Sequence, residues 1–221
     1  MSDLHQGLTS ARLMLRAMAR WGERVAFSGY GGSYTYSQCL DLIGRYQAVM
    51  QGVGAERGQR IALLNANRAE AWLVGVAAQG LGLCLTPLHP VGSFDDQQFI
   101  LEDGEFDYLL VDVENYLERG AELAAATDRL KHVFTLGAAD YGLDLRAAAA
   151  NAGAVSPVLW AQPGDEAWVS YTGGTTGASK GVMLSHRNLI ANCHNWTAIT
   201  QPTSEDISTV MAPLFHAAGS N

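Results

Sequence analysis

The sequence has little charge and no cluster of basic residues. Its 221 residues include 14 lysines and arginines and 22 aspartates and glutamates, which gives 16% charged residues and a formal net charge of −8. Typical soluble domains carry roughly 25% charged residues. Because no basic run or patch occurs, we expect no nucleic-acid partner. The negative net charge of the chain repels anions, so any anionic ligand must be bound by hydrogen-bond donors or positive charges close to it.

Long apolar runs, a signal pattern and a cysteine framework are also missing. The longest apolar stretch, residues 71–85, is shorter than the roughly 18 residues of a membrane helix, and Gln79 and several glycines interrupt it. Arginines break the apolar residues near the N-terminus. Cys39, Cys84 and Cys193 are far apart, so we expect buried free thiols rather than disulfides or a metal site. These features predict a cytoplasmic protein without a transmembrane segment.

Strand and helix patterns alternate through the middle of the chain. Short apolar runs typical of strands occur at residues 60–65, 83–88, 107–112 and 131–136. Helical patterns separate them, at residues 69–80, from Ser93 to Gly104, and at residues 114–126. The strand runs are nearly continuous rather than alternating, which is typical of a parallel sheet buried on both faces. We therefore predict an α/β fold, a layered and mostly parallel sheet with helices on both faces.

Two helix patterns and a hairpin signal precede this alternation. Residues 8–22 form an amphipathic pattern that Thr9 or Ser10 can cap. A Gly-Gly pair at 31–32 lies between two short strand patterns and indicates a hairpin. Ser37 can cap the helix that follows.

The periodicity weakens between residues 137 and 166. A low-complexity stretch, AAAANAGA, and two prolines indicate a boundary or a surface crossover there. We predict an N-terminal α/β subdomain over residues 1–165 and the start of a second subdomain over residues 166–221. The second part is expected to contain a strand, a helix and a last strand, at residues 167–172, 185–199 and 207–213.

The segment YTGGTTGASKG, residues 171–181, surrounds one lysine with glycines and threonines. It is neither a Walker A loop nor a dinucleotide fingerprint, since Gly177 and Lys180 are not adjacent and Thr172 replaces the fingerprint's first glycine. Glycines let backbone N–H groups turn towards an anion, threonines add hydroxyl donors, and the lysine adds a point charge. A strand before the loop and a helix after it would also favour anion binding. The predicted phosphate-binding residues are Thr172, Gly173, Gly174, Thr175, Thr176, Gly177 and Lys180. A flexible surface loop with a chance lysine is the alternative.

Residues 170–189, SYTGGTTGASKGVMLSHRNL, closely resemble the phosphate-loop signature of the adenylate-forming, AMP-binding enzymes. This superfamily includes acyl-CoA synthetases, firefly luciferase and the adenylation domains of nonribosomal peptide synthetases. The chain departs from the signature at Gly173, where serine is usual, and at Ser179, where proline is usual. The lysine and the threonine pair are retained. A second segment, APLFHAAG at residues 212–219, resembles the family's Pro-Leu-Phe-His-x-x-Gly, and this likeness places Phe215 and His216 at the acyl-substrate pocket. The alternative for His216 is a histidine packed at a strand end near the surface.

The resemblance implies an acid–thiol ligase of the acyl-CoA synthetase type. Such enzymes use MgATP to convert a carboxylic acid to an acyl-adenylate, then transfer the acyl group to coenzyme A or to a carrier-protein thiol. The loop residues would position the β- and γ-phosphates, and Thr176 would place a hydroxyl near Mg²⁺. Ser185 is expected to cap the helix at 185–199 rather than act as a nucleophile. The spacing of His186 and His194 does not favour a metal site.

The family's adenine, ribose and catalytic-lysine motifs follow the phosphate loop and are not found in these residues. We therefore expect the N-terminal part of a longer ligase that is inactive alone and binds ATP weakly. No catalytic residue is assigned within it. Apolar sheet surface left uncovered makes a homodimer an open alternative to a monomer. The alternative function is a noncatalytic α/β scaffold or partner-binding module with a vestigial phosphate loop.

Overall fold

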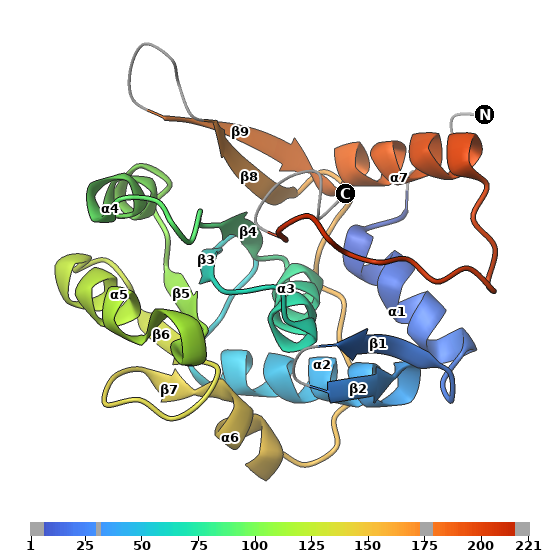
Figure 1. The fold of residues 1–221 in the computed structure, drawn as a ribbon, viewed down its shortest axis with the longest axis horizontal. Coiled ribbons are helices and arrows are strands. Elements are labelled where there is room, and N and C mark those ends of the chain that lie inside the picture. Colours follow the sequence, from blue (N-terminus) through green and yellow to red (C-terminus); the bar gives the residue numbers. More distant parts are fainter. Residues whose placement is uncertain (1–6, 30–31, 173–178, 215–221) are drawn as a thin grey trace.

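The structure is a computed structural model that describes residues 7–29, 32–172 and 179–214 (Figure 1). Its main sheet is formed by β3 (Arg60–Leu64), β4 (Cys84–Pro87), β5 (Tyr108–Val111), β6 (His132–Thr135), β7 (Leu143–Asp144), β8 (Glu166–Thr172) and β9 (Lys180–Ser185). The strands lie in the order β7-β6-β5-β3-β4-β8-β9. All neighbouring pairs are parallel except β8 and β9, which form an antiparallel hairpin. A separate antiparallel hairpin consists of β1 (Val25–Gly29) and β2 (Gly32–Thr35).

Helices cover both faces of this sheet, which confirms the predicted fold class. Along β3, Ile61 and Leu63 face one core, whereas Ala62 and Leu64 face the other, because successive strand residues point to opposite sides. The first core includes residues of α1 (Ser10–Arg20), α2 (Tyr36–Gly52), α3 (Ala69–Leu81) and α6 (Leu145–Asn151). The second includes residues of α4 (Phe94–Asp103) and α5 (Val113–Ala126) (Figure 1).

Local capping residues determine where several helices begin. Thr9, one of the two expected caps, caps α1, and Ser93, where the helical pattern begins, caps α4; each accepts a backbone N–H bond from the first turn. Ser185 caps α7 (His186–Thr200) in a reciprocal capping box with Asn188. The expected cap Ser37 is wrong: Thr35 caps α2, because Gln38 completes a capping box with it and places Ser37 inside the first turn.

The weakly periodic stretch holds two short elements and a crossover. The strand β7 and the helix α6 were not predicted, since two strand residues and a short alanine-rich helix carry little periodic signal. The chain then crosses α2 and α3. Gln47 binds Val158 by two hydrogen bonds, donating to its carbonyl at 3.0 Å and accepting from its N–H at 2.8 Å. Trp160 N–H donates to the Gly80 carbonyl at 2.8 Å, so the crossover is tied to both helices.

The predicted strand at residues 207–213 is wrong. The backbone there forms no strand, and Ile207 and Met211 are 96% and 86% exposed. Apolar residues alone do not make a strand when no neighbouring strand in the described sheet pairs with them. The boundary between residues 165 and 166 stays a prediction, and the strands on either side of it join one sheet through a single parallel pair, Leu85 with Trp168.

Three further expectations concern the cysteines, the membrane and the sheet edge. Cys39 and Cys84 are buried free thiols as expected, whereas Cys193 is only partly buried. Within the described ranges no helix is both long and apolar enough to cross a bilayer. At the sheet edge β9 exposes Val182 and Met183, and the oligomeric state stays a prediction.

Candidate functional site

The predicted phosphate loop connects the two strands of the β8–β9 hairpin. The strand and the helix expected on either side of the loop are present as β8 and α7, but the strand β9 between the loop and α7 was not predicted. The residues after Lys180 form a strand since they pair in register with β8 from Tyr171 to Trp168. The N-terminus of α7 is therefore not the end of the loop, and its dipole cannot be counted among the loop's anion donors.

Two of the predicted phosphate-binding residues lie opposite each other where the loop leaves the hairpin. Thr172 on β8 pairs with Lys180 on β9, and the Thr172 hydroxyl donates to the Lys180 carbonyl at 3.4 Å. Both residues are exposed. The remaining predicted ligands, including the metal residue Thr176, lie outside the described residues: Gly173, Gly174, Thr175, Thr176 and Gly177. Among the residues that are described, no group of three His, Cys, Asp or Glu side chains could hold a metal ion.

Lys180 is an exposed positive charge beside the loop. Lys131, the other lysine of the chain, forms an ion pair with Asp107 at 3.0 Å. No ion pair of Lys180 occurs within the described part of the chain. An exposed ammonium beside a threonine hydroxyl suits a phosphate chain, which offers several acceptor oxygens.

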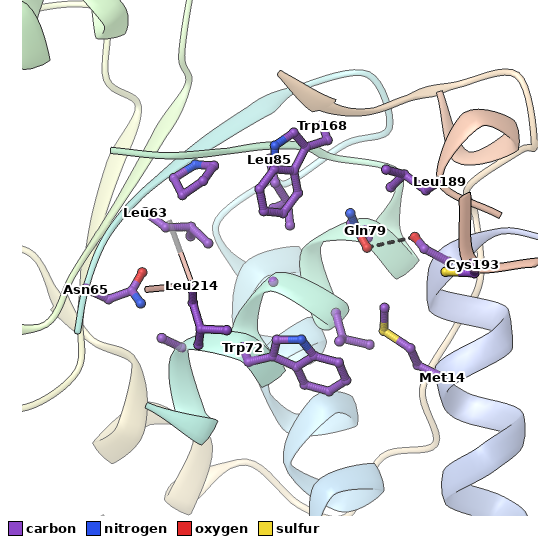
Figure 2. A pocket seen from close by; sticks show the side chains of 15 residues that line it. Met14, Leu63, Asn65, Trp72, Gln79, Leu85, Trp168, Leu189, Cys193 and Leu214 are labelled. Carbon is purple, nitrogen blue, oxygen red and sulfur yellow. Dashed lines mark hydrogen bonds between the residues drawn. The ribbon is translucent and has the colours of Figure 1, made fainter. Parts of the chain in front are cut away.

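An apolar cavity of about 120 Å³ lies on the α3 side of the sheet, between β4, β8 and α7 (Figure 2). Trp168 from β8 and Trp72 from α3 lie on opposite sides of it, and Leu189 and Cys193 line it from α7. The sequence did not mark these residues as a group. Hydrophobic periodicity predicted their elements, but no local signal brings β8, α3 and α7 to one cavity.

The segment before the predicted acyl-pocket residues reaches this cavity. Leu214 lines it, and the Leu214 N–H donates to Asn67 Oδ1 at 2.8 Å. Asn67 Nδ2 donates in turn to the Ala212 carbonyl at 3.0 Å. Phe215 and His216 themselves lie outside the described residues. The polypeptide that leads to them is thus held beside α3 by one asparagine.

A buried histidine joins α7 to α1 next to the cavity. His186 is fully buried, and its Nδ1 lies 2.8 Å from Ser10 Oγ and 3.3 Å from the Ser10 backbone nitrogen. Ser10 Oγ also donates to Gln79 Oε1 at 2.8 Å, drawn as the dashed line in Figure 2. Burial lowers the pKa of His186 to about 4, although the nearby Asp165 carboxylate acts to raise it. The imidazole is therefore neutral at pH 7 and holds two helices together.

Comparison with known proteins identifies the family of this chain. Residues 14–221 match the family model described as AMP-binding enzyme, and the chain belongs to this family.

Its relatives are CoA ligases. The chain is 28% identical to the 4-coumarate–CoA ligase-like protein 9 of Oryza sativa subsp. japonica, over 96% of its own length and 39% of that protein. It is 34% identical to the medium/long-chain-fatty-acid–CoA ligase FadD8 of Mycobacterium tuberculosis, over 83% of its length and 33% of that protein. The crystal structure of the anthranilate CoA ligase AuaEII in complex with anthranoyl-AMP superposes with a TM-score of 0.89 at 19% identity, covering all of this chain and 42% of that one. The chain thus spans about two fifths of the length of these proteins or less.

Proposed function

We propose that the chain is part of an ATP-dependent carboxylic acid–CoA ligase and that its β8–β9 hairpin binds the phosphates of ATP. The observation that carries the proposal is the pairing of Thr172 with Lys180 at the mouth of the glycine loop. The exposed Thr172 hydroxyl and the Lys180 ammonium, which has no ion pair within the described residues, meet the need for local donors in a chain of net charge −8. Membership of the AMP-binding family and the CoA-ligase relatives support the same assignment.

The proposed reaction has two steps. A carboxylate oxygen bonds to the α-phosphorus of ATP while the bond to pyrophosphate breaks, which gives an acyl-adenylate. The sulfur of coenzyme A, or of a carrier-protein thiol, then bonds to the acyl carbon, and AMP leaves. The loop residues would hold the β- and γ-phosphates and stabilise the charge that develops on pyrophosphate. Mg²⁺, when bound, would neutralise phosphate charge, and Thr176 would offer it a hydroxyl.

The acid is proposed to bind beside Phe215 and His216. Leu214, which precedes them, lines the apolar cavity between Trp72 and Trp168. An apolar cavity favours an acid with a nonpolar body, because burial of such a body removes apolar surface from water. The motifs by which the family binds adenine, ribose and the α-phosphate are not found in these 221 residues. We therefore propose that the chain alone does not catalyse adenylation of an acid.

The two lysines of the chain allow a direct test of the phosphate site. An amine-acylating reagent is applied with and without MgATP, and the modification of Lys180 and Lys131 is measured by peptide mass spectrometry. We expect MgATP to protect Lys180 and to leave Lys131 unaffected. Lys131 directly precedes β6, which four strands separate from β9 in the sheet, and it is paired with Asp107. Lys180→Ala should weaken MgATP binding about tenfold or more, whereas Lys131→Ala should not change it. Equal modification of Lys180 with and without MgATP, together with unchanged binding by Lys180→Ala, would favour the noncatalytic scaffold.

A further inference from the structure

The part of the β8–β9 hairpin that carries the phosphate site extends beyond the rest of the sheet (Figure 1). β8 pairs with β4 only at Leu85 and Trp168, and the Thr86 hydroxyl adds a bond to the Val169 carbonyl at 2.9 Å. From Ser170 onward β8 pairs with β9 alone, and β9 is the last strand of the sheet. A two-stranded ribbon is marginally stable by itself. The position of Thr172 and Lys180 therefore depends on whatever else holds this outer half of the hairpin, residues 170–172 and 179–182.

One side chain joins the outer half of the hairpin to another element. Tyr171 packs against the second core, and its hydroxyl donates to Asp103 Oδ2 at 2.7 Å. Asp103 is the last residue of α4. Within the described residues this is the one hydrogen bond that links the outer half of the hairpin to the rest of the protein. Because strand residues alternate, Tyr171 points to the face opposite Thr172, and the hydrogen bond leaves Thr172 and Lys180 uncovered.

Gly181 shows that the ring of Tyr171 is fitted closely to the strand that carries Lys180. Gly181 pairs with Tyr171 across the hairpin. A Cβ atom at this glycine would lie 2.8 Å from Val169 Cγ1 and 3.2 Å from Tyr171 Cζ, so a side chain there would clash with Val169 and press against the ring. The tyrosine thus contacts both strands at the base of the loop while its hydroxyl reaches α4.

We propose that Tyr171 and Asp103 are positioning residues for the phosphate site. Their hydrogen bond holds the outer half of the hairpin against α4. Thr172 and Lys180 are therefore in position before the nucleotide binds and do not have to be ordered by it. Donors that are held in place before the ligand binds lose less conformational freedom on binding, and this raises affinity. The inference rests on the proposed binding of ATP phosphates by the loop. Sequence reasoning could not find the pair, since the two residues are 68 positions apart.

The test removes the hydroxyl and compares two readouts in the 221-residue chain. In Tyr171→Phe the ring remains and the bond to Asp103 is lost. We expect amide hydrogen exchange in residues 179–185 to become about fivefold faster and the Kd for MgATP to rise about fivefold, as for loss of one solvent-accessible hydrogen bond to a carboxylate. Asp103→Asn keeps an acceptor oxygen, so its exchange rate and its Kd for MgATP should stay close to those of the unsubstituted chain. Asp103→Ala removes the acceptor and should resemble Tyr171→Phe. Tyr141→Phe is the matched control, because Tyr141 donates a similar bond to the Leu117 carbonyl at 2.9 Å, far from the hairpin.

The outcomes separate this inference from the proposed function. If exchange in residues 179–185 is unchanged in Tyr171→Phe, the hydroxyl does not hold the hairpin and the inference is overturned. If exchange is faster but MgATP binds as before, while Lys180→Ala weakens binding, the phosphate site stands and only the positioning role fails. If the unsubstituted chain binds no MgATP, the proposed function fails and the positioning role fails with it.

Discussion

Acidification between pH 6.5 and pH 4 should destabilise the protein through His186. The imidazole is fully buried at the start of α7, where its Nδ1 lies 2.8 Å from Ser10 Oγ and 3.3 Å from the Ser10 backbone nitrogen. A second proton on the ring would place a positive charge in this buried contact. A charged imidazolium would also lack the water that solvates it in the unfolded chain.

The size of the effect follows from the two pKa values of His186. The unfolded histidine titrates near its ordinary pKa of 6.5, whereas burial lowers the pKa of the folded one to about 4. Between these values the unfolded chain binds more protons, so the free energy of unfolding falls as the pH falls. The contribution is fully present above pH 6.5 and is lost progressively towards pH 4. At about 1.4 kcal/mol per pH unit of difference, the loss at pH 4.5 relative to pH 7.5 is about 2.5 kcal/mol.

Urea unfolding at pH 7.5 and pH 4.5 measures this loss. The variant His186→Asn keeps an acceptor oxygen near Ser10 but cannot titrate. It should be less stable than the unsubstituted chain at pH 7.5, because the smaller side chain leaves a void. Its loss of unfolding free energy on acidification should be smaller by about 2.5 kcal/mol, since the variant and the unsubstituted chain have all other titratable groups in common. His132→Asn, at an exposed position on β6, is the control and should follow the unsubstituted chain. Equal losses in His186→Asn and the unsubstituted chain would refute the argument.

Two further predictions concern the crossover and catalysis. Gly44→Ala should lower the free energy of unfolding by about 2 kcal/mol and expose residues 152–160 to proteolysis, because its Cβ would lie against the Val155 carbonyl. Gly52→Ala, in the same helix, is the control, because a Cβ atom there meets open space and the substitution should be neutral or stabilising. Equal proteolysis of the two variants would contradict the close approach of the Val155 carbonyl to Gly44. Carboxylate-dependent ATP–pyrophosphate exchange by this chain should be undetectable, and measurable exchange above a Lys180→Ala control would show that its residues suffice for adenylation.

Local patterns in the sequence determined the fold class, most element positions and the family. Continuous apolar runs such as residues 60–65 predict buried parallel strands, and caps such as Thr9 and Ser185 act on N–H groups within one helical turn. The resemblance to the adenylate-forming enzymes rests on contiguous residues, 170–189 and 212–219. All of these signals depend on neighbours a few positions away, so they can be read without knowing the path of the chain.

The tertiary structure alone decided which distant residues meet. The segment after Lys180 is a strand because β8 pairs with it, whereas residues 207–213, which are also apolar, have no strand beside them and form none. Tyr171 contacts Asp103, which is 68 positions away in the sequence, and His186 contacts Ser10, which is 176 positions away. Strand pairing and buried polar contacts are made between segments that folding brings together, and no local propensity encodes such a partner.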